Sequence, residues 1–387
     1  MPRTPASSRK KRANPPSDAA LWTVRDEFLM RECLALAREA LGLTSPNPAV
    51  GCVIVRNGKI VGRGITGVGG RPHAEAEALC AAGARARGAT VYVSFEPCAH
   101  QGKTPPCAAA LVQAGVSRVV AGCLDPYPPV RGRGLAILKR AGIETVVGVL
   151  AAECRELNEG FITRVTRGRP FVVLKLATSL DGRIAAQNGD ARWVSSEQSR
   201  LLVHQWRRES DVVMVGAGTV IADNPRLTCR IEGGRDPVRV IIDGHLRSPH
   251  DAVVFHLRSP APTILVTAAH NLDTARHNYP GVEVLTVSGR EGVLRLDELM
   301  CEFARRGWSK VLLEGGAHLA ASALDAGVVD RVAFFLAPRI IGTGLAAVEG
   351  LSSATVRDAL RLGPMHARMV GEDWLIEAPV NHRRSGA

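Results

Sequence analysis

Residues 94–115 read SFEPCAHQGKTPPCAAALVQAG, and a second informative segment, HAEAEAL (73–79), lies upstream of them. Together the two segments supply two histidines, His73 and His100, and two cysteines, Cys98 and Cys107. A run typical of a β-strand, TVYVSF, comes just before Cys98, and CAAALVQAG is typical of a helix. Two prolines directly precede Cys107, and proline is favoured where helices begin. The sequence therefore predicts a strand, a loop and a helix, with one cysteine after the strand and the other at the start of the helix.

These side chains have the composition of a catalytic zinc site. Such a site uses three nitrogen, sulfur or oxygen ligands and leaves a fourth position open for water, and His73, Cys98 and Cys107 are the natural three. A helix N-terminus favours negative charge, so a thiolate there is a better ligand. Zinc lowers the pKa of its bound water to near neutrality. Glu75 could then move a proton from that water to a leaving amine without binding the metal.

A purely structural interpretation is the alternative, with His73 capping its helix and both cysteines packed in a core. It is the simpler interpretation for any one of these residues, but the order H-x-E, then P-C, then a cysteine at a helix start favours zinc. His100, in the intervening loop, is a further candidate ligand, and a fourth protein ligand would close the site. The remaining cysteines lie in apolar segments and are expected to be buried as small hydrophobic residues: Cys33, Cys52, Cys80, Cys123, Cys154, Cys229 and Cys301.

Composition restricts the classes of partner. The net charge of +12 would suit a nucleic-acid-binding protein, but five of the positive charges lie in residues 1–19, a polar, proline-rich tail expected to be disordered. Aromatic residues make up only 4% of the chain, which leaves few platforms for stacking bases. Neither a membrane-spanning apolar run nor a secretory signal is found. The nine cysteines have no disulfide-like spacing, so a cytoplasmic protein with no nucleic-acid or membrane partner is expected.

Strands and helices alternate along two parts of the chain. Residues 20–150 are predicted to form an α/β sandwich that begins with a helix at 26–39 and continues with two strands joined at Asn57-Gly58. Residues 151–168 are predicted to be a helical connector. A second strand–helix series occupies 169–381, with a capped helix at 195–210 and strands in FVVLKLATSLDG, DVVMVGAGT, VRVIIDG, PTILVT, VEVLTV and KVLLEGG. The two parts share no internal repeat.

The second part has no complete dinucleotide fingerprint. In VGAGTVIA, isoleucine Ile221 stands where the third glycine of G-x-G-x-x-G would be. In VLLEGGAHLAASAL, a predicted strand runs through Gly315 and Gly316 into a helix, and such a turn offers backbone N–H groups and a helix dipole to a phosphate. Either segment alone is equally consistent with an ordinary strand–helix turn.

The order of motifs resembles one family. TSPNPAVGCVIV (44–55), PHAEAEAL (72–79), EPCAHQGKTPPC (96–107) and DPYPPVRGRG (125–134) are similar to the deaminase half of the bifunctional riboflavin biosynthesis (RibD) family. KLATSLDGRIA, GAGTVIADNPRLTCR, VIIDG and LLEGGAHLAASAL are similar to its reductase half. The eight residues between the two cysteines are a feature of this family, whereas deaminases of nucleic acids and free cytidine have two.

The resemblance implies an N-terminal cytidine-deaminase-like α/β/α sandwich and a C-terminal dihydrofolate-reductase-like α/β domain. It implies catalytic Zn²⁺ in the first and NADPH in the second. A homo-oligomer is also expected, although the sequence does not give the oligomeric state. The expected first reaction is hydrolytic deamination of 2,5-diamino-6-ribosylamino-4(3H)-pyrimidinone 5′-phosphate. The second is reduction of the ribosyl group of 5-amino-6-(5-phosphoribosylamino)uracil to ribityl. NADPH rests on the resemblance alone, since the sequence assigns no arginine to a ribose 2′-phosphate.

Matched position by position, the resemblance also implies contacts. Those of the deaminase substrate are Asn47, Lys103 and Asp125; Lys103 as a solvated loop charge is the alternative. Those of the cofactor are Ala177, Trp193, Thr219, Asp223, Gly244, Gly316, Ala317, His318 and Leu319. Those of the reductase substrate are Lys175, Ala191, Arg207, Leu227, Arg230 and Glu314, and the two arginines suit a 5′-phosphate. Lys175 and Asp181 are expected either to orient the ribosyl chain or to form an ion pair at a strand end.

Three residues depart from the family pattern. Ala191 and Gly244 stand where serine is common, and His318 stands where threonine is common. Two other interpretations stay open: a nucleic-acid-editing deaminase, which the cysteine spacing and the scarcity of aromatic residues disfavour, and a zinc-stabilised binding module, which a fourth ligand such as His100 would support.

Overall fold

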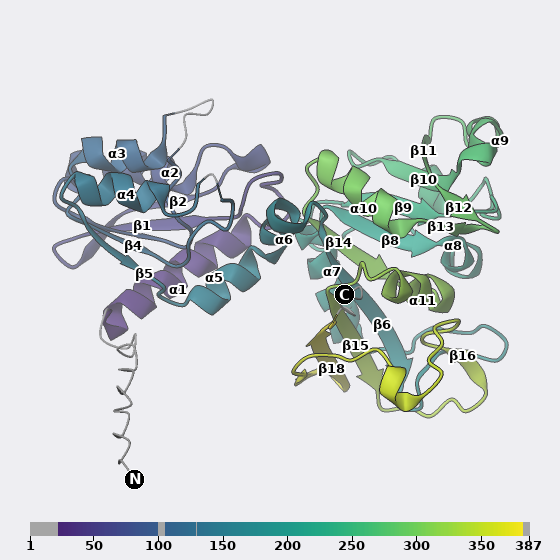
Figure 1. Ribbon diagram of the computed structural model, residues 1–387. Helices are drawn as coiled ribbons and strands as arrows, with labels where there is room; N and C mark the ends of the chain where they lie inside the picture. Colours follow the sequence, from purple (N-terminus) through teal and green to yellow (C-terminus); the bar gives the residue numbers. More distant parts are fainter. Residues whose placement is uncertain (1–21, 100–104, 129, 382–387) are drawn as a thin grey trace, which may run out of the picture.

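The computed structural model describes residues 22–99, 105–128 and 130–381, which form two α/β lobes (Figure 1). The helices α5 (Ala151–Leu157) and α6 (Glu159–Arg167) connect the sheet of one lobe to the sheet of the other. The expected tail at 1–19 and two residues of the cysteine loop, His100 and Lys103, lie outside the described residues.

A five-stranded sheet forms the centre of the first lobe, in the order β2-β1-β3-β4-β5. The first two strands form the predicted hairpin, whose turn residues Asn57 and Gly58 have positive φ angles of 46° and 78°. The hairpin is antiparallel to β3, and β3, β4 and β5 run parallel. The strands are β1 (Gly51–Arg56), β2 (Lys59–Ile65), β3 (Thr90–Val93), β4 (Arg118–Ala121) and β5 (Glu144–Val147).

Helices cover both faces of this sheet. Figure 1 shows α1 and α5 on one face and α2, α3 and α4 on the other. At the start of α1, Thr23 and Asp26 form a capping box, in which each side chain accepts from the other residue's backbone N–H. The first-lobe helices besides α5 are α1 (Val24–Glu39), α2 (Ala74–Ala82), α3 (Cys107–Ala114) and α4 (Arg133–Arg140).

The second lobe is built on a nine-stranded sheet in the order β11-β10-β9-β8-β14-β6-β15-β18-β17. In this order the neighbouring strands β11, β10, β9, β8, β14, β6 and β15 run parallel to one another, and β18 and β17 add an antiparallel edge. The strands are β6 (Phe171–Ser179), β8 (Val212–Gly216), β9 (Val238–Ile242), β10 (Thr263–Ala268), β11 (Glu283–Val287), β14 (Lys310–Glu314), β15 (Arg331–Ala337), β17 (His366–Val370) and β18 (Asp373–Pro379). Short pairs are β7 (Arg183–Ala186) with β16 (Gly344–Ala346), and β12 (Gly289–Arg290) with β13 (Val293–Leu294).

Alternate strand residues point to opposite faces of this sheet, and different helices bury each set. α10 and α11 cover the face that carries the side chains of Val172, Leu174 and Leu176. α8 and α9 cover the opposite face, which carries Val213 and Val215, and α7 packs on this second face near β15. These helices are α7 (Glu197–Glu209), α8 (Ala217–Asp223), α9 (Leu272–Asn278), α10 (Leu296–Arg305) and α11 (Ala317–Asp325).

The observed fold confirms the predicted class, a deaminase-like α/β/α sandwich followed by a reductase-like α/β unit. The sequence analysis did not predict β15, β17 or β18, nor the helix α8 in the segment interpreted as a glycine turn. Within the described residues no helix is long and apolar enough to cross a membrane.

One expectation about the cysteines was wrong. Cys80 and Cys301 are exposed, because they lie on the sides of their helices that face away from the sheets. Cys229, in the segment after α8, is half-buried. The other four lie in the cores as predicted: Cys33, Cys52, Cys123 and Cys154.

Candidate active sites

Three side chains that could hold a metal converge at one edge of the first sheet. His73 is the N-cap residue of α2, Cys98 lies in the loop after β3, and Cys107 is the first residue of α3. The imidazole Nδ1 lies 3.2 Å from Sγ of Cys107 and 3.6 Å from Sγ of Cys98, and all three ligand atoms lie within 4.8 Å of one another. The His73 side chain makes no capping hydrogen bond. The helix-capping alternative therefore does not hold.

The two thiols share a proton that a cation could replace. The pKa of Cys98 is lowered to about 4, chiefly because the thiol of Cys107 donates a hydrogen bond to it and also because of the His73 imidazole. The backbone N–H of Cys107 donates to the same sulfur at 3.2 Å. The pKa of Cys107 is raised correspondingly, by that shared proton and by burial. One nitrogen and two sulfur donors around a cluster that already stabilises a thiolate fit zinc.

Glu75 lies beside this cluster in the first turn of α2. Its residue is only 4% exposed, and burial is the main reason that the pKa of its carboxyl is raised to about 7. A carboxyl group with a pKa near the working pH is suited to both accepting and returning a proton.

Loops around the cluster position two of the expected substrate contacts. Asn47 donates from Nδ2 to the carbonyl of Gly70 at 3.0 Å, and Asp125 lies in the loop after β4. That loop is held by Glu96, a buried carboxylate that the sequence analysis did not single out. Its oxygens accept from the backbone N–H groups of Asp125, Gly132 and Gly134 at 3.2, 2.9 and 3.1 Å. Glu96 adjoins Pro97-Cys98, and this adjacency to the motif was the signal available in the sequence.

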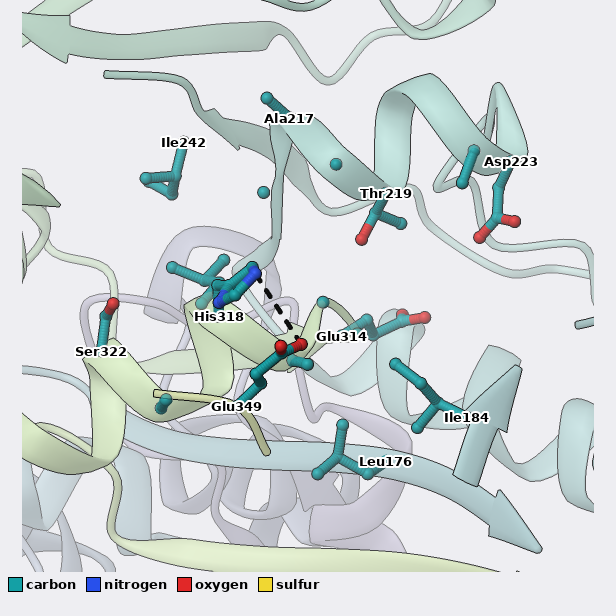
Figure 2. A pocket seen from close by; sticks show the side chains of 18 of the residues that line it. Leu176, Ile184, Ala217, Thr219, Asp223, Ile242, Glu314, His318, Ser322 and Glu349 are labelled. Atoms are coloured by element: carbon teal, nitrogen blue, oxygen red, sulfur yellow. Dashed lines mark ion pairs between the residues drawn. The ribbon is translucent and has the colours of Figure 1, made fainter. Parts of the chain in front are cut away.

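The second lobe contains a large cleft of about 1190 Å³ (Figure 2). It lies at the carboxyl ends of β6, β8, β9 and β14, where open α/β sheets bind ligands. Single-ligand pockets occupy roughly 300–1,000 Å³, so this cleft has room for a cofactor and a substrate together.

The residues expected at the cofactor all line this cleft: Ala177, Trp193, Thr219, Asp223, Gly244, Gly316, Ala317, His318 and Leu319. Gly315 and Gly316 have positive φ angles of 64° and 85° and turn the chain from β14 into α11. A Cβ on Gly316 would lie 3.3 Å from Oγ1 of Thr219, so the turn and α8 approach closely. His318 faces Glu349 across the rim, with Nε2 3.8 Å from Oε2 (Figure 2). A cleft with this glycine turn fits a dinucleotide.

The structure explains the glycine at position 244. A Cβ there would lie 2.1 Å from the carbonyl oxygen of Gly292, since the loop after β9 packs directly on the β12–β13 turn. The common serine would not fit without a backbone shift.

Most residues expected at the reductase substrate also line the cleft, namely Lys175, Ala191, Arg207, Arg230 and Glu314. Leu227 differs: its side chain is 3% exposed and packs in the apolar cluster beneath α8. Asp181 is also elsewhere, at an exposed turn, where it accepts from the backbone N–H groups of Ile341 and Gly342. The proposed ion pair between Lys175 and Asp181 is therefore not formed. Burial lowers the pKa of the Lys175 ammonium group within the cleft.

The two arginines differ in their surroundings. Arg207 forms a bidentate ion pair with Glu314, with Nε–Oε1 and Nη2–Oε2 distances of 2.6 and 2.7 Å. Arg230 is exposed to the cleft and makes no ion pair within the part of the chain that the structure describes. Other cleft residues, among them His204, Arg247 and Arg295, were not predicted from the sequence. Neither a motif nor a spacing marked them, because tertiary packing alone brings them to the cleft.

Comparisons with known proteins agree with this two-site architecture. A family model described as the RibD C-terminal domain matches residues 170–376, and one described as the cytidine and deoxycytidylate deaminase zinc-binding region matches residues 23–123. The riboflavin biosynthesis protein RibD of Aquifex aeolicus is 41% identical, with 91% of this chain and 97% of the relative aligned. The RibD of Synechocystis is 42% identical over 91% of this chain and 95% of its own length.

A solved structure gives the same result. The diaminohydroxyphosphoribosylaminopyrimidine deaminase/5-amino-6-(5-phosphoribosylamino)uracil reductase of Thermotoga maritima superposes with a TM-score of 0.81. It is 36% identical, and the alignment covers 92% of this chain and 99% of the other.

Fold and sites together define a bifunctional enzyme, with a zinc-dependent deaminase in one lobe and an NADPH-dependent reductase in the other. The chain belongs to the riboflavin biosynthesis protein RibD family.

Proposed function

We propose that the first lobe hydrolytically deaminates 2,5-diamino-6-ribosylamino-4(3H)-pyrimidinone 5′-phosphate, with His73, Cys98 and Cys107 holding Zn²⁺. The single observation that carries this proposal is the three-donor cluster with the buried Glu75 beside it. Zinc with three protein ligands supplies Lewis acidity and lowers the pKa of water. Glu75 accepts the proton of the attacking water and delivers a proton to the departing amine, which its raised pKa permits near neutrality.

The pyrimidine lies in this proposal between the loop that carries Asn47 and the loop that carries Asp125. Both side chains are half-buried, and each loop is tied by backbone hydrogen bonds, which keeps the contacts in place before substrate arrives. Lys103, assigned from the resemblance, completes the set as a cation for the substrate's anionic or carbonyl oxygens.

The second lobe reduces the ribosyl group of 5-amino-6-(5-phosphoribosylamino)uracil in the large cleft. NADPH supplies the hydride when it is bound. Thr219, Asp223 and the turn at Gly316 would hold it, and the N–H groups at the start of α11 would be available to its pyrophosphate. Arg230 binds the 5′-phosphate of the substrate, because the donors of Arg207 are already directed at Glu314. Lys175 contacts the ribosyl chain from the floor of the cleft.

The preference for NADPH over NADH also receives a candidate explanation. Arg247 and Arg295 both line the cleft, and Arg247 follows Gly244 by three residues in the chain. The Arg295 guanidinium is paired with Asp297, whereas the Arg247 side chain is exposed, so Arg247 is the better partner for a ribose 2′-phosphate. Replacing Arg247 by glutamine should raise KM for NADPH about tenfold and leave KM for NADH unchanged. An equal change for both cofactors would contradict the assignment.

Two further properties belong to this proposal. All nine cysteines are free thiols, which supports a cytoplasmic location. The exposed Met365, Met369 and Trp374 lie on or beside the antiparallel edge of the second sheet and support a homo-oligomer that covers this edge. Light scattering during gel filtration measures the oligomeric state, and a monomer at micromolar concentration would contradict it.

Each half of the proposal has its own test in the full-length chain. Glu75→Gln should abolish amine release from the diaminopyrimidine while NADPH oxidation with the deaminated substrate continues. Arg230→Gln should do the reverse, weakening the reductase for its phosphorylated substrate and leaving the deaminase intact. If either variant impaired both reactions alike in a folded protein, the separation into two independent sites would be wrong.

A further inference from the structure

His204 is a buried titratable group in the reductase cleft that the proposed chemistry does not use. It lies on the inner side of α7. His204 is only 8% exposed, yet it is one of the residues that line the cleft. Its ring touches Arg230 at three points. Nε2 lies 3.2 Å from Nε and 3.1 Å from Nη2 of the guanidinium, and Nδ1 lies 3.3 Å from the backbone N of Arg230.

The protonation state of the ring follows from these contacts. A guanidinium only donates hydrogen bonds, so Nε2 must accept and cannot carry a proton. The single proton of the neutral ring is then on Nδ1. The contact from the backbone N–H of Arg230 to Nδ1, at 3.3 Å, belongs to the other tautomer, and the two shorter contacts favour the one in which Nε2 accepts from the guanidinium.

The surroundings of His204 keep it neutral. Burial, then the neighbouring cations Arg207 and Arg230, lower the pKa of the imidazole to about 4, against a smaller opposite effect of Glu314. A protonated ring would set an N–H and a positive charge against the guanidinium, and the contact would be lost. Above about pH 5 the ring is therefore available as an acceptor.

We infer that His204 is a positioning residue of the reductase: its Nε2 fixes the guanidinium of Arg230 in the orientation that receives the substrate's 5′-phosphate. Arg230 needs such a partner because it has no carboxylate among the described residues and its long side chain is otherwise free to rotate. A neutral acceptor orients the guanidinium without neutralising it, so the full positive charge is left for the phosphate. A carboxylate here would compete with the phosphate, as Glu314 does at Arg207. This inference rests on the proposed assignment of Arg230 to the phosphate.

The segment before Arg230 is tied to Arg207. The backbone carbonyl of Thr228 accepts from Nη1 of Arg207 at 3.0 Å. The ion pair of Arg207 with Glu314 thereby holds the segment from which Arg230 projects, while His204 contacts the Arg230 guanidinium itself. His204 has no direct place in the hydride transfer.

Two polar substitutions separate the ring nitrogens. In His204→Gln the side-chain amide reaches the position of Nε2 and its oxygen can accept from Arg230. In His204→Asn the amide reaches only the position of Nδ1. The full-length variants are assayed with NADPH and either the phosphorylated substrate or its dephosphorylated nucleoside, with Gln205→Ala, an exposed residue of the same helix, as the control.

We expect His204→Asn to raise KM for the phosphorylated substrate about tenfold, the value of one hydrogen bond to a charged group. Its kcat should change less than about twofold, and its KM for the nucleoside should match wild type. His204→Gln should restore KM to within about threefold of wild type. In an Arg230→Gln background, His204→Asn should have no further effect.

The outcomes distinguish an error in the phosphate assignment of Arg230 from an error in the role of His204. If Arg230→Gln left KM for the phosphorylated substrate unchanged, the phosphate assignment itself would be wrong. If Arg230→Gln raised KM but the asparagine and glutamine variants of His204 behaved alike, or affected phosphorylated and dephosphorylated substrates equally, His204 would be a structural residue only. Melting curves of both variants show whether they are folded, and NADPH fluorescence titrations should give the wild-type Kd in each.

Discussion

Nδ1 of His73 and Sγ of Cys107 lie 3.2 Å apart, although 34 residues separate them in the chain. The contact arises because α2 and α3 pack on the same face of the first sheet and both begin at the same edge. Cys98 reaches the same point from the end of β3. Two of the three expected ligands thus come from helix N-termini, and the third comes from the loop after β3.

Removing one ligand should remove the metal. Cys107→Ser should reduce bound zinc from about one per chain to near zero, since hydroxyl is a poor replacement for a thiolate in a site with three protein ligands. Atomic absorption after gel filtration measures the metal, and NADPH oxidation with the deaminated substrate should continue. Cys80→Ser is the matched control, because that thiol is exposed and outside the cluster. Zinc retained by Cys107→Ser at the wild-type level would contradict the ligand assignment.

Glu96 should matter to the deaminase although it is assigned no contact with substrate. Its two oxygens accept from three backbone N–H groups, two in the loop that carries Asp125 and one, that of Gly134, in the first turn of α4. Glu96→Gln replaces one acceptor by a donor. We expect KM for the diaminopyrimidine to rise about tenfold, with zinc content and reductase activity unchanged. Steady-state assays of both reactions check this, and an unchanged deaminase KM would show that the loop is held by other contacts.

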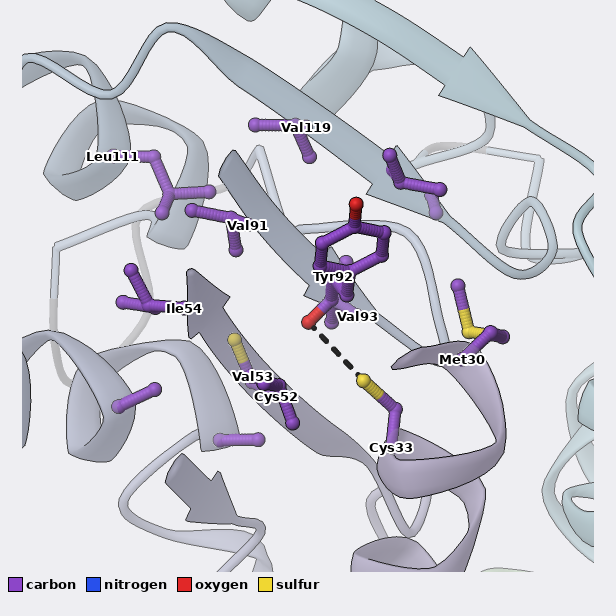
Figure 3. Close-up of a cluster of buried hydrophobic side chains, with 14 of the residues drawn as sticks. Met30, Cys33, Cys52, Val53, Ile54, Val91, Tyr92, Val93, Leu111 and Val119 are labelled. Carbon is purple, nitrogen blue, oxygen red and sulfur yellow. Dashed lines mark hydrogen bonds between the residues drawn. The ribbon is translucent and has the colours of Figure 1, made fainter. Parts of the chain in front are cut away.

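The ion pair at the start of α1 predicts how the first lobe responds to acid. Asp26 is buried, and its carboxylate accepts from Arg118 at 2.8 Å, Tyr92 Oη at 2.8 Å and Thr23 N at 2.8 Å. Tyr92 extends from the apolar core of that lobe (Figure 3). Burial alone would raise the pKa of Asp26, but these hydrogen bonds outweigh it and hold the pKa well below its usual range.

A carboxyl whose pKa is lower in the folded state stabilises the fold above its unfolded pKa, about 4, and that stability is lost as the pH falls further. Asp26→Asn should cost roughly 3 kcal/mol at pH 7, because it leaves Arg118 without its buried partner. Below pH 4 the difference between variant and wild type should shrink. Denaturant titrations at several pH values measure this difference in the free energy of unfolding. Arg31→Gln is the control: it removes an exposed ion pair with Glu27 and should have almost no effect. A difference that persisted undiminished at low pH would contradict this origin.

Serine, which is common at this position in the family, should be poorly tolerated in place of Gly244. Gly244→Ser sets a Cβ 2.1 Å from the carbonyl oxygen of Gly292 and should destabilise the second lobe by about 1–3 kcal/mol while weakening NADPH binding. Gly218→Ala is the stability control, because a Cβ there meets no atom within 4 Å. Thermal melting with and without NADPH tests both variants, and a serine variant as stable as wild type would show that the two loops can separate freely.

Local pattern explains which parts of the structure could be predicted from the sequence. The convergence of His73, Cys98 and Cys107 could be expected because each of them stands near a strand or helix end that its neighbours identify. The hairpin at Asn57-Gly58 was predicted for the same reason, since the turn chemistry is contained in two residues.

What the sequence did not predict depends on distant segments meeting. His204 and Arg230 meet only because α7 packs beside the segment after α8, and Gly244 meets Gly292 through two loops. The antiparallel edge formed by β17 and β18 was missed because β17 is largely exposed and lacks the alternation that marks a half-buried strand. The cofactor contacts came from the resemblance, since a dinucleotide is bound largely through backbone N–H groups, which leave little trace in side-chain pattern.

The most direct test of the two-site account is a mass-spectrometric time course with zinc-loaded wild-type protein, the diaminopyrimidine phosphate and NADPH, run beside Glu75→Gln and beside wild type without NADPH. Wild type should first exchange the ring amine for oxygen, with or without NADPH, and should then add two hydrogens to the ribosyl group only when NADPH is present. Glu75→Gln should slow amine loss at least about a hundredfold. Wild type that returned the substrate unchanged, or a Glu75→Gln variant that deaminated at the wild-type rate, would contradict the account.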